Sequence, residues 1–312
     1  FDVIVFGSCI VDFISYVPRL PKPGETLHGT KFATGYGGKG ANQCVAAARL
    51  GSKTAMIGKV GTDTWGKDYR SNLQSEGINV DYVDIINGEP TGIAQINVAN
   101  NGENQIVIVV GANNHLQAAD VTKCINYFEK AKILICQLET PENGTIKALE
   151  LFKGISILNA APAITNIRME LLKLPSIFCV NETEASLISG INVDTPLDAA
   201  KAVTKLKELG CNTVVITLGA KGVVFSKKDC TNIVHVDAIK VDNVVDTTGA
   251  GDAFIGALGH FMAKYPHIDL ANSIGAACEV ASKSVQLPGT QSSFPKSVDI
   301  DLNIKTYNWR YL

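Results

Sequence analysis

Short, almost wholly apolar and β-branched runs recur along the chain, and segments with helical periodicity separate them. The runs are Val3 to Phe6, Ile133 to Cys136, Ile155 to Leu158, Ile177 to Val180 and Val214 to Leu218. Runs of this kind are typical of parallel strands that are covered on both faces. A helical pattern from Leu197 to Leu209 follows Thr195-Pro196, which provides an N-cap and a first-turn proline, and Gly210 ends it. The alternation predicts a layered α/β fold.

Two regions interrupt the alternation. Residues of about 13–36 contain three prolines, and residues of about 91–111 have the pattern of two strands, Ile93 to Val98 and Gln105 to Val110. Asn100-Asn101-Gly102 joins these two strands, and Asn-Gly between alternating runs is a strong hairpin signal. A hairpin inserted into an α/β domain predicts a small sheet that serves as a lid.

The stretch Asp246 to Phe254 combines an anion site with a candidate base. Upstream, Ile239 to Val245 alternates as a β-strand does, and downstream Phe254, Ala257, Leu258 and Phe261 have the spacing of a helix's buried face. A Gly-x-Gly turn lies between them, so unpaired backbone N–H groups of the first helical turn can approach an anion such as a phosphoryl group.

Asp252 lies in this same turn. A carboxylate beside an anion site can accept a proton from an attacking hydroxyl, which is the minimal equipment of a phosphotransferase. We therefore expect Asp252 to be the catalytic base and the N–H groups of Gly249, Ala250 and Gly251 to form the anion hole. The alternative is an acid that merely complements the helix dipole.

A second glycine motif, Gly35 to Gln43, leads directly into an alanine-rich helix that Gly51 ends. The motif is not a P-loop, because Ala33 and Gly40 occupy the positions where that motif needs Gly and Ser/Thr. Lys39, Asn42 and Gln43 are available there as polar donors. The alternative is a plain loop before a buried helix.

Polar residues follow most of the predicted strands directly, for example Glu139, Asn159 and Asn181. Ligands of open parallel sheets bind outside the carboxyl ends of the strands, so we expect these residues to converge along one edge. Asn181 and Glu184 also have the spacing of a helix capping box, and both interpretations can hold together.

Composition excludes several other classes of protein. The chain has 28 basic and 30 acidic residues and no basic stripe, which argues against nucleic acid as a partner. Its longest apolar runs are too short for a membrane span, and no signal-peptide pattern opens it. Its eight cysteines form no Cys-x-x-Cys pair, and its five histidines have no metal-ligand spacing. A reducing, cytosolic setting is the simplest account.

Seven motifs in this order make the chain resemble the ribokinase-like family of sugar and nucleoside kinases, over essentially its whole length. They are Gly7 to Asp12, Gly37 to Asn42, Gln137 to Glu139, Asn181 to Ala185, Thr217 to Gly222, Asp246 to Asp252 and Gly289 to Ser293. The resemblance implies a single domain of residues 1–312, built as a three-layer α/β/α sandwich with a mostly parallel central sheet. It also implies a β-sheet lid, formed by about 13–36 and 91–111, that covers the sugar and pairs two subunits as a homodimer.

The same resemblance implies ATP-dependent phosphorylation of the 5-hydroxyl of D-ribose in the cytoplasm or nucleus, with Mg²⁺ and an activating K⁺ ion. The implied sugar contacts are Ile10, Val11, Asp12, Gly38, Lys39, Gly40, Ala41, Asn42, Glu139 and Asp252. The implied nucleotide contacts are Asn181, Glu184, Thr217, Leu218, Gly219, Ala220, Lys221, Gly222 and Gly251, with Glu184 organising Mg²⁺. The implied K⁺ ligands are Asp246, Thr248, Ser284, Leu287, Gly289 and Ser293.

Other functions remain open at this point. A related kinase could act on deoxyribose, fructose or a nucleoside with an unchanged anion hole. A non-catalytic sugar- or nucleotide-binding protein would have no need for Asp252 beside that hole. A dinucleotide-binding dehydrogenase is disfavoured, because Gly7 to Asp12 lacks the later glycines of its fingerprint.

Overall fold

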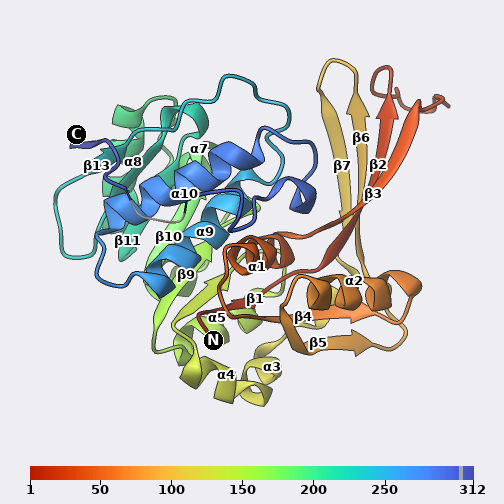
Figure 1. Ribbon diagram of the computed structural model, residues 1–312, viewed down its shortest axis with the longest axis horizontal. Helices are drawn as coiled ribbons and strands as arrows, with labels where there is room; N and C mark the ends of the chain where they lie inside the picture. Colours follow the sequence, from red (N-terminus) through yellow and green to blue (C-terminus); the bar gives the residue numbers. More distant parts are fainter. Residues whose placement is uncertain (302–304) are drawn as a thin grey trace.

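The computed structural model describes residues 1–301 and 305–312, and its main element is a ten-stranded twisted sheet (Figure 1). From one edge to the other, its strands are β14 (Trp309–Tyr311), β13 (Val234–Val236), β12 (Val223–Ser226), β11 (Thr213–Thr217), β10 (Ile177–Asn181), β9 (Ile155–Asn159), β8 (Ile133–Cys136), β1 (Val3–Phe6), β4 (Thr54–Gly61) and β5 (Asn79–Ile86).

The seven strands from β11 to β5 pair in parallel, and β12, β13 and β14 extend the sheet in antiparallel fashion. The central strands are buried along their whole length because helices cover both faces; β1 and β8 are examples. The predicted mostly parallel sheet is therefore confirmed. The predicted alternation of strands and helices is confirmed as well.

Ten helices in the described part of the chain form the layers above and below this sheet: α1 (Lys39–Arg49), α2 (Thr64–Ser75), α3 (Ala118–Lys123), α4 (Ile125–Lys130), α5 (Glu142–Leu151), α6 (Met169–Lys173), α7 (Glu182–Ser189), α8 (Pro196–Glu208), α9 (Ala250–Lys264) and α10 (Leu270–Ser284). Helices α1, α2, α9 and α10 pack on one face, and α3 to α8 supply the core of the other. Within residues 1–301 and 305–312, none of the helices is long and apolar enough to cross a membrane.

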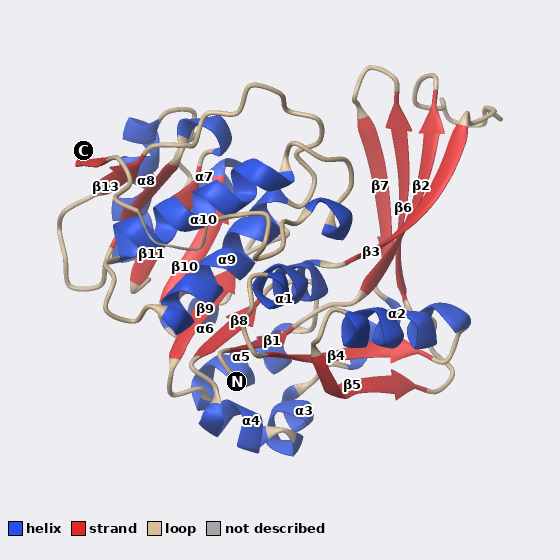
Figure 2. Cartoon of the chain, viewed as in Figure 1, coloured by secondary structure: helices blue, strands red, loops and turns tan. Residues whose placement is uncertain are grey.

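A separate four-stranded sheet projects from the body of the molecule (Figure 2). Its strands, in order, are β3 (Lys31–Gly37), β2 (Ile10–Val17), β6 (Gly92–Ala99) and β7 (Asn104–Val109). Strands β6 and β7 are antiparallel, with a turn at Asn100 to Gly102, so the predicted hairpin is confirmed. We call this element the small sheet.

One expected strand is absent. Residues 239–245 form no strand, and Val244 and Val245 are exposed. The backbone N–H groups of Val245 and Asp246 instead donate to the carbonyl of Val285, which fixes the segment to the end of α10. Alternating apolar residues indicate a strand only where a neighbouring strand offers a ladder of partners, and none does so here.

Helices α1 and α9 cross at very short range. Gly256 of α9 lies so close to α1 that a Cβ atom there would come within 2.4 Å of the Gln43 carbonyl oxygen and 2.6 Å of the Ala46 Cβ. Small residues on both helices permit this approach, and both helices are buried along the crossing. The two helices therefore present the residues of their first turns to the same place.

Candidate active site

Asp252 lies in the first turn of α9, at the predicted turn between loop and helix. Gly249 is the N-cap of this helix and has a φ of +78°, a conformation that side chains other than glycine rarely adopt. A Cβ atom at Gly249 would also approach the Thr290 methyl group to 2.6 Å. Glycine is therefore required here by both the backbone and the packing.

Two amides of α1 hold the Asp252 carboxylate. The Nδ2 of Asn42 donates to one carboxylate oxygen, and the Nε2 of Gln43 donates to the other, each at 2.9 Å. All three side chains are buried. Because both oxygens are engaged, the plane of the carboxylate is fixed before any substrate binds.

These amides are fixed in turn by residues that were not among the predicted sugar, nucleotide or cation contacts. Gln43 also donates to Asn159 Oδ1 at 3.0 Å, and Gln137 donates to Gln43 at 2.7 Å. Gln291 donates to Asn42 Oδ1 at 3.0 Å. Gln137 and Gln291 lie within the motifs Gln137 to Glu139 and Gly289 to Ser293, but only their placement beneath Asp252 shows that their side chains belong to the site.

Glu139 occupies the other side of the cluster. Its Oε2 accepts hydrogen bonds from the Ser8 hydroxyl at 2.5 Å and from the backbone N–H of Lys39 at 2.8 Å. Ser8 Oγ in turn accepts from the N–H of Gly40 at 3.2 Å. The start of α1 thus joins the loops that follow β1 and β8, as the edge argument predicted. Ser8 lies in the motif Gly7 to Asp12 but was not among the predicted site contacts.

The carboxylates perturb one another. Burial, together with the nearby charges of Glu139 and Asp252, raises the pKa of Asp12 to about 7. Burial also raises the pKa of Glu139. Burial alone would lower the pKa of Lys39, but the charges of Asp252, Glu139 and Glu184 outweigh it and raise that pKa. A single ammonium group therefore balances several buried acids.

The backbone groups implied as sugar contacts are largely used within the protein. The N–H of Gly40 donates to Ser8 Oγ, and that of Ala41 donates to the Ser8 carbonyl at 2.9 Å. The side chains of Ile10 and Val11 are buried in β2, with Val11 in the hydrophobic core. Gly38 has a φ of +84° where β3 passes into α1.

A cavity of about 200 Å³ collects some of the residues expected at the edge of the sheet, Asn159 and Asn181 among them, but not Glu139. It is lined by Lys39, Asn159, Ala161, Cys179, Val180, Asn181, Glu184, Thr217, Gly249, Gly251, Asp252, Phe254 and Ile255. These residues come from the carboxyl ends of β9, β10 and β11 and from the first turns of α1, α7 and α9. Asn159 and Asn181 therefore converge at one edge as expected, and Glu139 is linked to the cavity through its hydrogen bond from the Lys39 N–H.

On the β10 side of this cavity, Asn181 and Glu184 form the capping box of α7. Asn181 Oδ1 accepts from the Glu184 N–H, and a Glu184 carboxylate oxygen accepts from the Asn181 N–H, both at 2.9 Å. Burial raises the pKa of Glu184. The capping interpretation is confirmed, and the same two side chains line the cavity.

The turn after β11 contributes mainly backbone. Leu218 is buried in the core, whereas Gly219, Ala220 and Lys221 are exposed. The Lys221 ammonium donates to the Asp194 carbonyl oxygen at 2.5 Å. Gly222 has a φ of +90°, and a Cβ atom there would meet the Val236 carbonyl oxygen at 2.1 Å. Glycine at this position allows β12 to begin close to β13.

The Asp246 carboxylate joins two loops. One oxygen accepts from the Thr248 N–H and the other from the Gly289 N–H, each at 2.9 Å. The buried hydroxyls of Ser284 and Ser293 donate to carbonyl groups one turn earlier, at 2.9 Å and 2.8 Å. The N–H of Ala250 donates to the Thr247 carbonyl at 3.2 Å.

Across the described residues, no cluster of three or more His, Cys, Asp or Glu side chains has the arrangement of a metal site.

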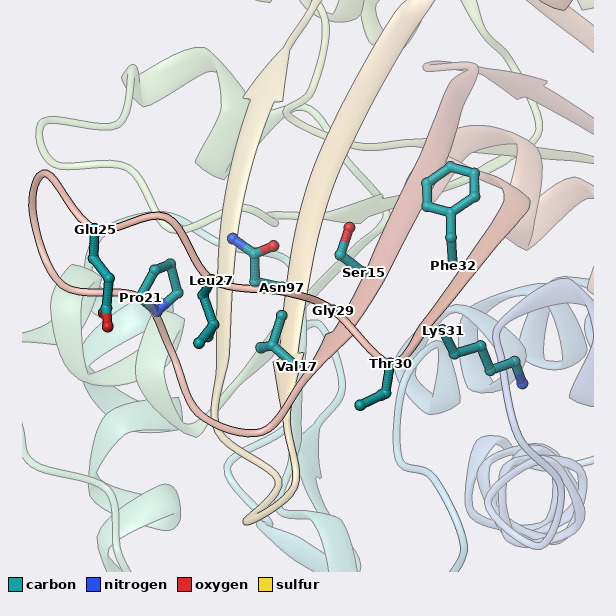
Figure 3. A pocket seen from close by; sticks show the side chains of 10 residues that line it. All are labelled: Ser15, Val17, Pro21, Glu25, Leu27, Gly29, Thr30, Lys31, Phe32 and Asn97. Carbon is teal, nitrogen blue, oxygen red and sulfur yellow. The ribbon is translucent and has the colours of Figure 1, made fainter.

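A larger hollow, of about 520 Å³, lies on the small sheet and not at this edge (Figure 3). The loop between β2 and β3 crosses the face of the sheet that carries Ser15, Val17 and Asn97. No group of acids or amides comparable to the cluster at Asp252 lines the hollow. The smaller cavity is therefore the candidate active site, because the buried acids and the glycine turn meet there.

Comparison with known proteins agrees with this geometry. Residues 1–297 match the family of pfkB carbohydrate kinases. The chain is 45% identical to mouse ribokinase, covering 96% of this chain and 94% of that one, and 40% identical to Salmonella typhi deoxyribokinase, covering 94% and 95%. A structure of Arabidopsis thaliana ribokinase complexed with ribose and ATP superposes with a TM-score of 0.88 at 33% identity, covering 95% of this chain and 96% of that one.

Proposed function

The chain belongs to the pfkB family of carbohydrate kinases, and from that membership we propose that it transfers the γ-phosphoryl group of ATP to the 5-hydroxyl of D-ribose. The products are D-ribose 5-phosphate and ADP. The observation that carries the proposal is the buried Asp252, which two amides fix at a cavity lined by Lys39 and Gly251.

In the proposed reaction, Asp252 removes the proton of the sugar hydroxyl, whose oxygen then attacks the γ-phosphorus in line. The first-turn N–H groups of α9, with Gly249 as its N-cap, meet the negative charge that develops on the transferring group. The Ala250 N–H already donates to Thr247, so the N–H of Gly251 is the donor best placed toward the cavity. Lys39 adds a positive charge beside the acids.

Asp12, Asn42 and Glu139 are the proposed sugar-binding side chains, together with Lys39 and the backbone of Ile10, Val11 and Gly38 to Ala41. A sugar needs several acceptors and donors in fixed positions, and buried carboxylates and amides supply both. The Asn42 amide and the Asp252 carboxylate are buried side by side. We propose that Asn42 gives up its hydrogen bond to Asp252 and binds a sugar hydroxyl instead. Asp12 belongs to the small sheet, which we propose as the lid of a single kinase domain of residues 1–312.

Asn181, Glu184 and Gly251 are proposed at the ATP phosphates, with Thr217 to Gly222 along the rest of the nucleotide. Mg²⁺ binds phosphates and retains several waters, so one protein carboxylate suits it better than a closed cage. Glu184 is the carboxylate that we propose for Mg²⁺, because it lines the cavity and the capping box already orients it. Mg²⁺ there would neutralise phosphate charge.

A monovalent cation, K⁺, is proposed between the two loops that Asp246 joins. The proposed ligands are oxygen atoms of Asp246, Thr248, Ser284, Leu287, Gly289 and Ser293. The residues fit such an ion, because hydroxyl, carboxylate and carbonyl oxygens are the ligands that hard cations take. Asp246 would hold the loops together around it. Equal activity in sodium and potassium buffers would remove this part of the proposal.

A homodimer through the small sheet is proposed from the exposure of β7. Ile106, Val107, Ile108 and Val109 are 46–61% exposed on this edge strand, which is a surface that soluble proteins usually cover. Ile106 and Ile108 share a face with Asp12 through the strand register. Changing Ile106 and Ile108 to Lys should give monomers in light scattering, whereas Val107→Lys with Val109→Lys, on the opposite face, should leave the dimer.

A cytoplasmic location is proposed on the state of the cysteines. All eight are unpaired, and six are buried. A chain of this kind suits a reducing compartment. Cell fractionation with a tagged chain tests this location directly.

The experiment that tests the function is ADP release from Mg·ATP with ribose, deoxyribose, fructose or adenosine, each in potassium and in sodium. Ribose-dependent turnover supports the proposal. Deoxyribose is the acceptor to compare most closely, because relatives with either activity align over nearly the whole chain. Turnover with another acceptor alone would retain Asp252 as the base and overturn the sugar assignment.

A further inference from the structure

Beneath Asp252 lies a chain of two buried amides, Gln43 and Gln137, which are not among the proposed contacts of either substrate. Gln43 and Gln137 are 0% and 1% exposed. Gln137 Nε2 donates to Gln43 Oε1 at 2.7 Å, and Gln43 Nε2 donates onward to Asp252 Oδ1 at 2.9 Å. Neither glutamine is implied as a contact of sugar, nucleotide or cation.

The direction of this chain is set by the carboxylate at its end. An ionised carboxylate only accepts hydrogen bonds, so Gln43 must turn its NH₂ group toward Asp252 and its oxygen away. That oxygen then needs a donor, which Gln137 provides. The oxygen of Gln137 is left against Gly7, where a Cβ atom would lie only 2.0 Å from it. The amide orientations thus follow one from another, from Asp252 back to β1.

The two donors to Asp252 differ in how easily a substrate could displace them. Asn42 is itself held by Gln291, and it adjoins the proposed sugar contacts. Gln43 is fully buried and bonded on three sides, to Asp252, Asn159 and Gln137. The close crossing of α1 and α9 at Gly256 involves the Gln43 backbone itself. Gln43 is therefore the donor that remains when sugar enters.

We propose that Gln43, oriented by Gln137, is a positioning residue that fixes the carboxylate of Asp252 for proton removal throughout turnover. This inference rests on the proposed function in taking Asp252 as the base. Geometry of this kind matters because a displacement of about 1 Å in a reacting group can lower the rate about 10²-fold. Gln43 acts through Asp252 and touches no substrate.

The charged side chains around Asp252 determine how a carboxylate substituted at residue 43 would ionise. They are Asp12 from β2, Lys39 from α1, Glu139 from the loop after β8 and Glu184 from α7. Three of these four are acids. A carboxylate placed at residue 43 would therefore share a proton with Asp252 over a range of pH, because two adjacent buried carboxylates do not both ionise readily.

The test uses two variants of the full-length protein. Gln43→Met keeps the shape and removes all three hydrogen bonds of the side chain. The kcat should fall about 10- to 100-fold, while the Kd values for ribose and ATP change less than about twofold. Gln43→Glu keeps the bond from Gln137; the acid limb of its kcat–pH profile should move upward by about one pH unit or more. A purely structural role would move neither kcat at saturation nor the pH profile.

Double-variant kinetics separate this inference from the proposed function. In an Asp252→Asn background, Gln43→Met should lower the residual kcat no further, because the group that it positions has gone. If Asp252→Asn alone leaves kcat near normal, the proposed base is wrong. If Asp252→Asn abolishes turnover while folded Gln43→Met keeps kcat within threefold and Gln43→Glu keeps its pH profile, Gln43 positions nothing. Should Gln43→Met fail to fold, the pH profile of Gln43→Glu decides.

Discussion

The proposed sugar side and the proposed phosphate side of the active site are built by different means. On the sugar side, buried side chains bond to one another: Asn42 and Gln43 hold Asp252, and Ser8 holds Glu139. On the phosphate side, the turn that contains Gly249 is largely exposed, and its donors are backbone N–H groups at a helix start. Side chains therefore determine the first half, and backbone conformation determines the second.

This difference predicts where substitutions will act. A change of one polar side chain on the sugar side leaves a buried partner without its bond. A change of an exposed side chain in the turn from Thr247 to Gly251 leaves the backbone donors in place, so within that turn only the glycines matter. The following variants test the contrast in order of expected effect.

Asp252→Asn should have the largest effect, because it removes the proposed base and also places an amide against two amide donors. Its kcat should fall about 10²- to 10⁴-fold. Steady-state kinetics at saturating ribose and ATP measure the loss, and ATP titration with thermal melting provides the control for folding. A near-normal kcat in a folded variant would show that the two sides do not meet at Asp252.

Glu139→Gln should raise the ribose KM about 10- to 100-fold, and the KM for ATP should change little. The hydroxyl of Ser8 and the N–H of Lys39 both donate to Glu139, and hydrogen bonds to a charged acceptor contribute about 1.5–3 kcal/mol. Initial-rate measurements with each substrate varied in turn separate the two constants. Equal increases in both KM values would contradict a division of the site into two sides.

Two glycines of the phosphate side form a matched pair. Gly249→Ala should destabilise the fold by about 1–2 kcal/mol, because its φ is +78° and the new methyl would meet Thr290. Gly251→Ala should leave the melting temperature unchanged, since no atom lies within 4 Å of its Cβ position, and should raise the KM for ATP instead. Thr247→Ala, at an exposed neighbour, is the control and should alter neither quantity. Reversed behaviour of the two glycines would refute the backbone account.

The smallest expected effect is a change in the pH dependence of stability. The pKa of Asp12 is raised from its ordinary value of 3.8 to about 7, so the folded protein holds this proton more tightly than the unfolded chain. This contribution to stability is complete below about pH 4 and is lost as pH rises through 7. Asp12→Asn should therefore melt a few degrees higher than the wild type at pH 8 and equally at pH 4. Calorimetry at both values measures this, and a constant difference would exclude Asp12 as the cause.

The sequence predicted those parts of the fold and site that depend on local pattern. Apolar runs located the buried strands, and the Gly-x-Gly turn located the start of α9 with Asp252 in it. Residues 239–245 show the limit, because alternation without a neighbouring strand produced an exposed loop. Strand β7 shows that an apolar run does not by itself predict burial, since all of its apolar residues are exposed.

Gln137 and Gln291 lie in motifs that the sequence showed, but the role of their side chains depends on long-range contact. Gln137 lies 94 residues from Gln43 in the chain, and Gln291 lies 249 residues from Asn42. Glutamine is an ordinary surface residue in most sequences, so its presence in the chain indicates nothing by itself. Only the three-dimensional arrangement brings these amides beneath one carboxylate.

The close crossing of α1 and α9 has a consequence for how such a protein can diversify. The proposed base Asp252 and the amides that hold it lie on two helices that cannot separate without opening the contact at Gly256. Asp12, by contrast, is carried by the small sheet, which projects from the body of the molecule (Figure 2). Changes in the small sheet could therefore alter which acceptor alcohol binds. The proposed base and the two helices that hold it would remain as they are.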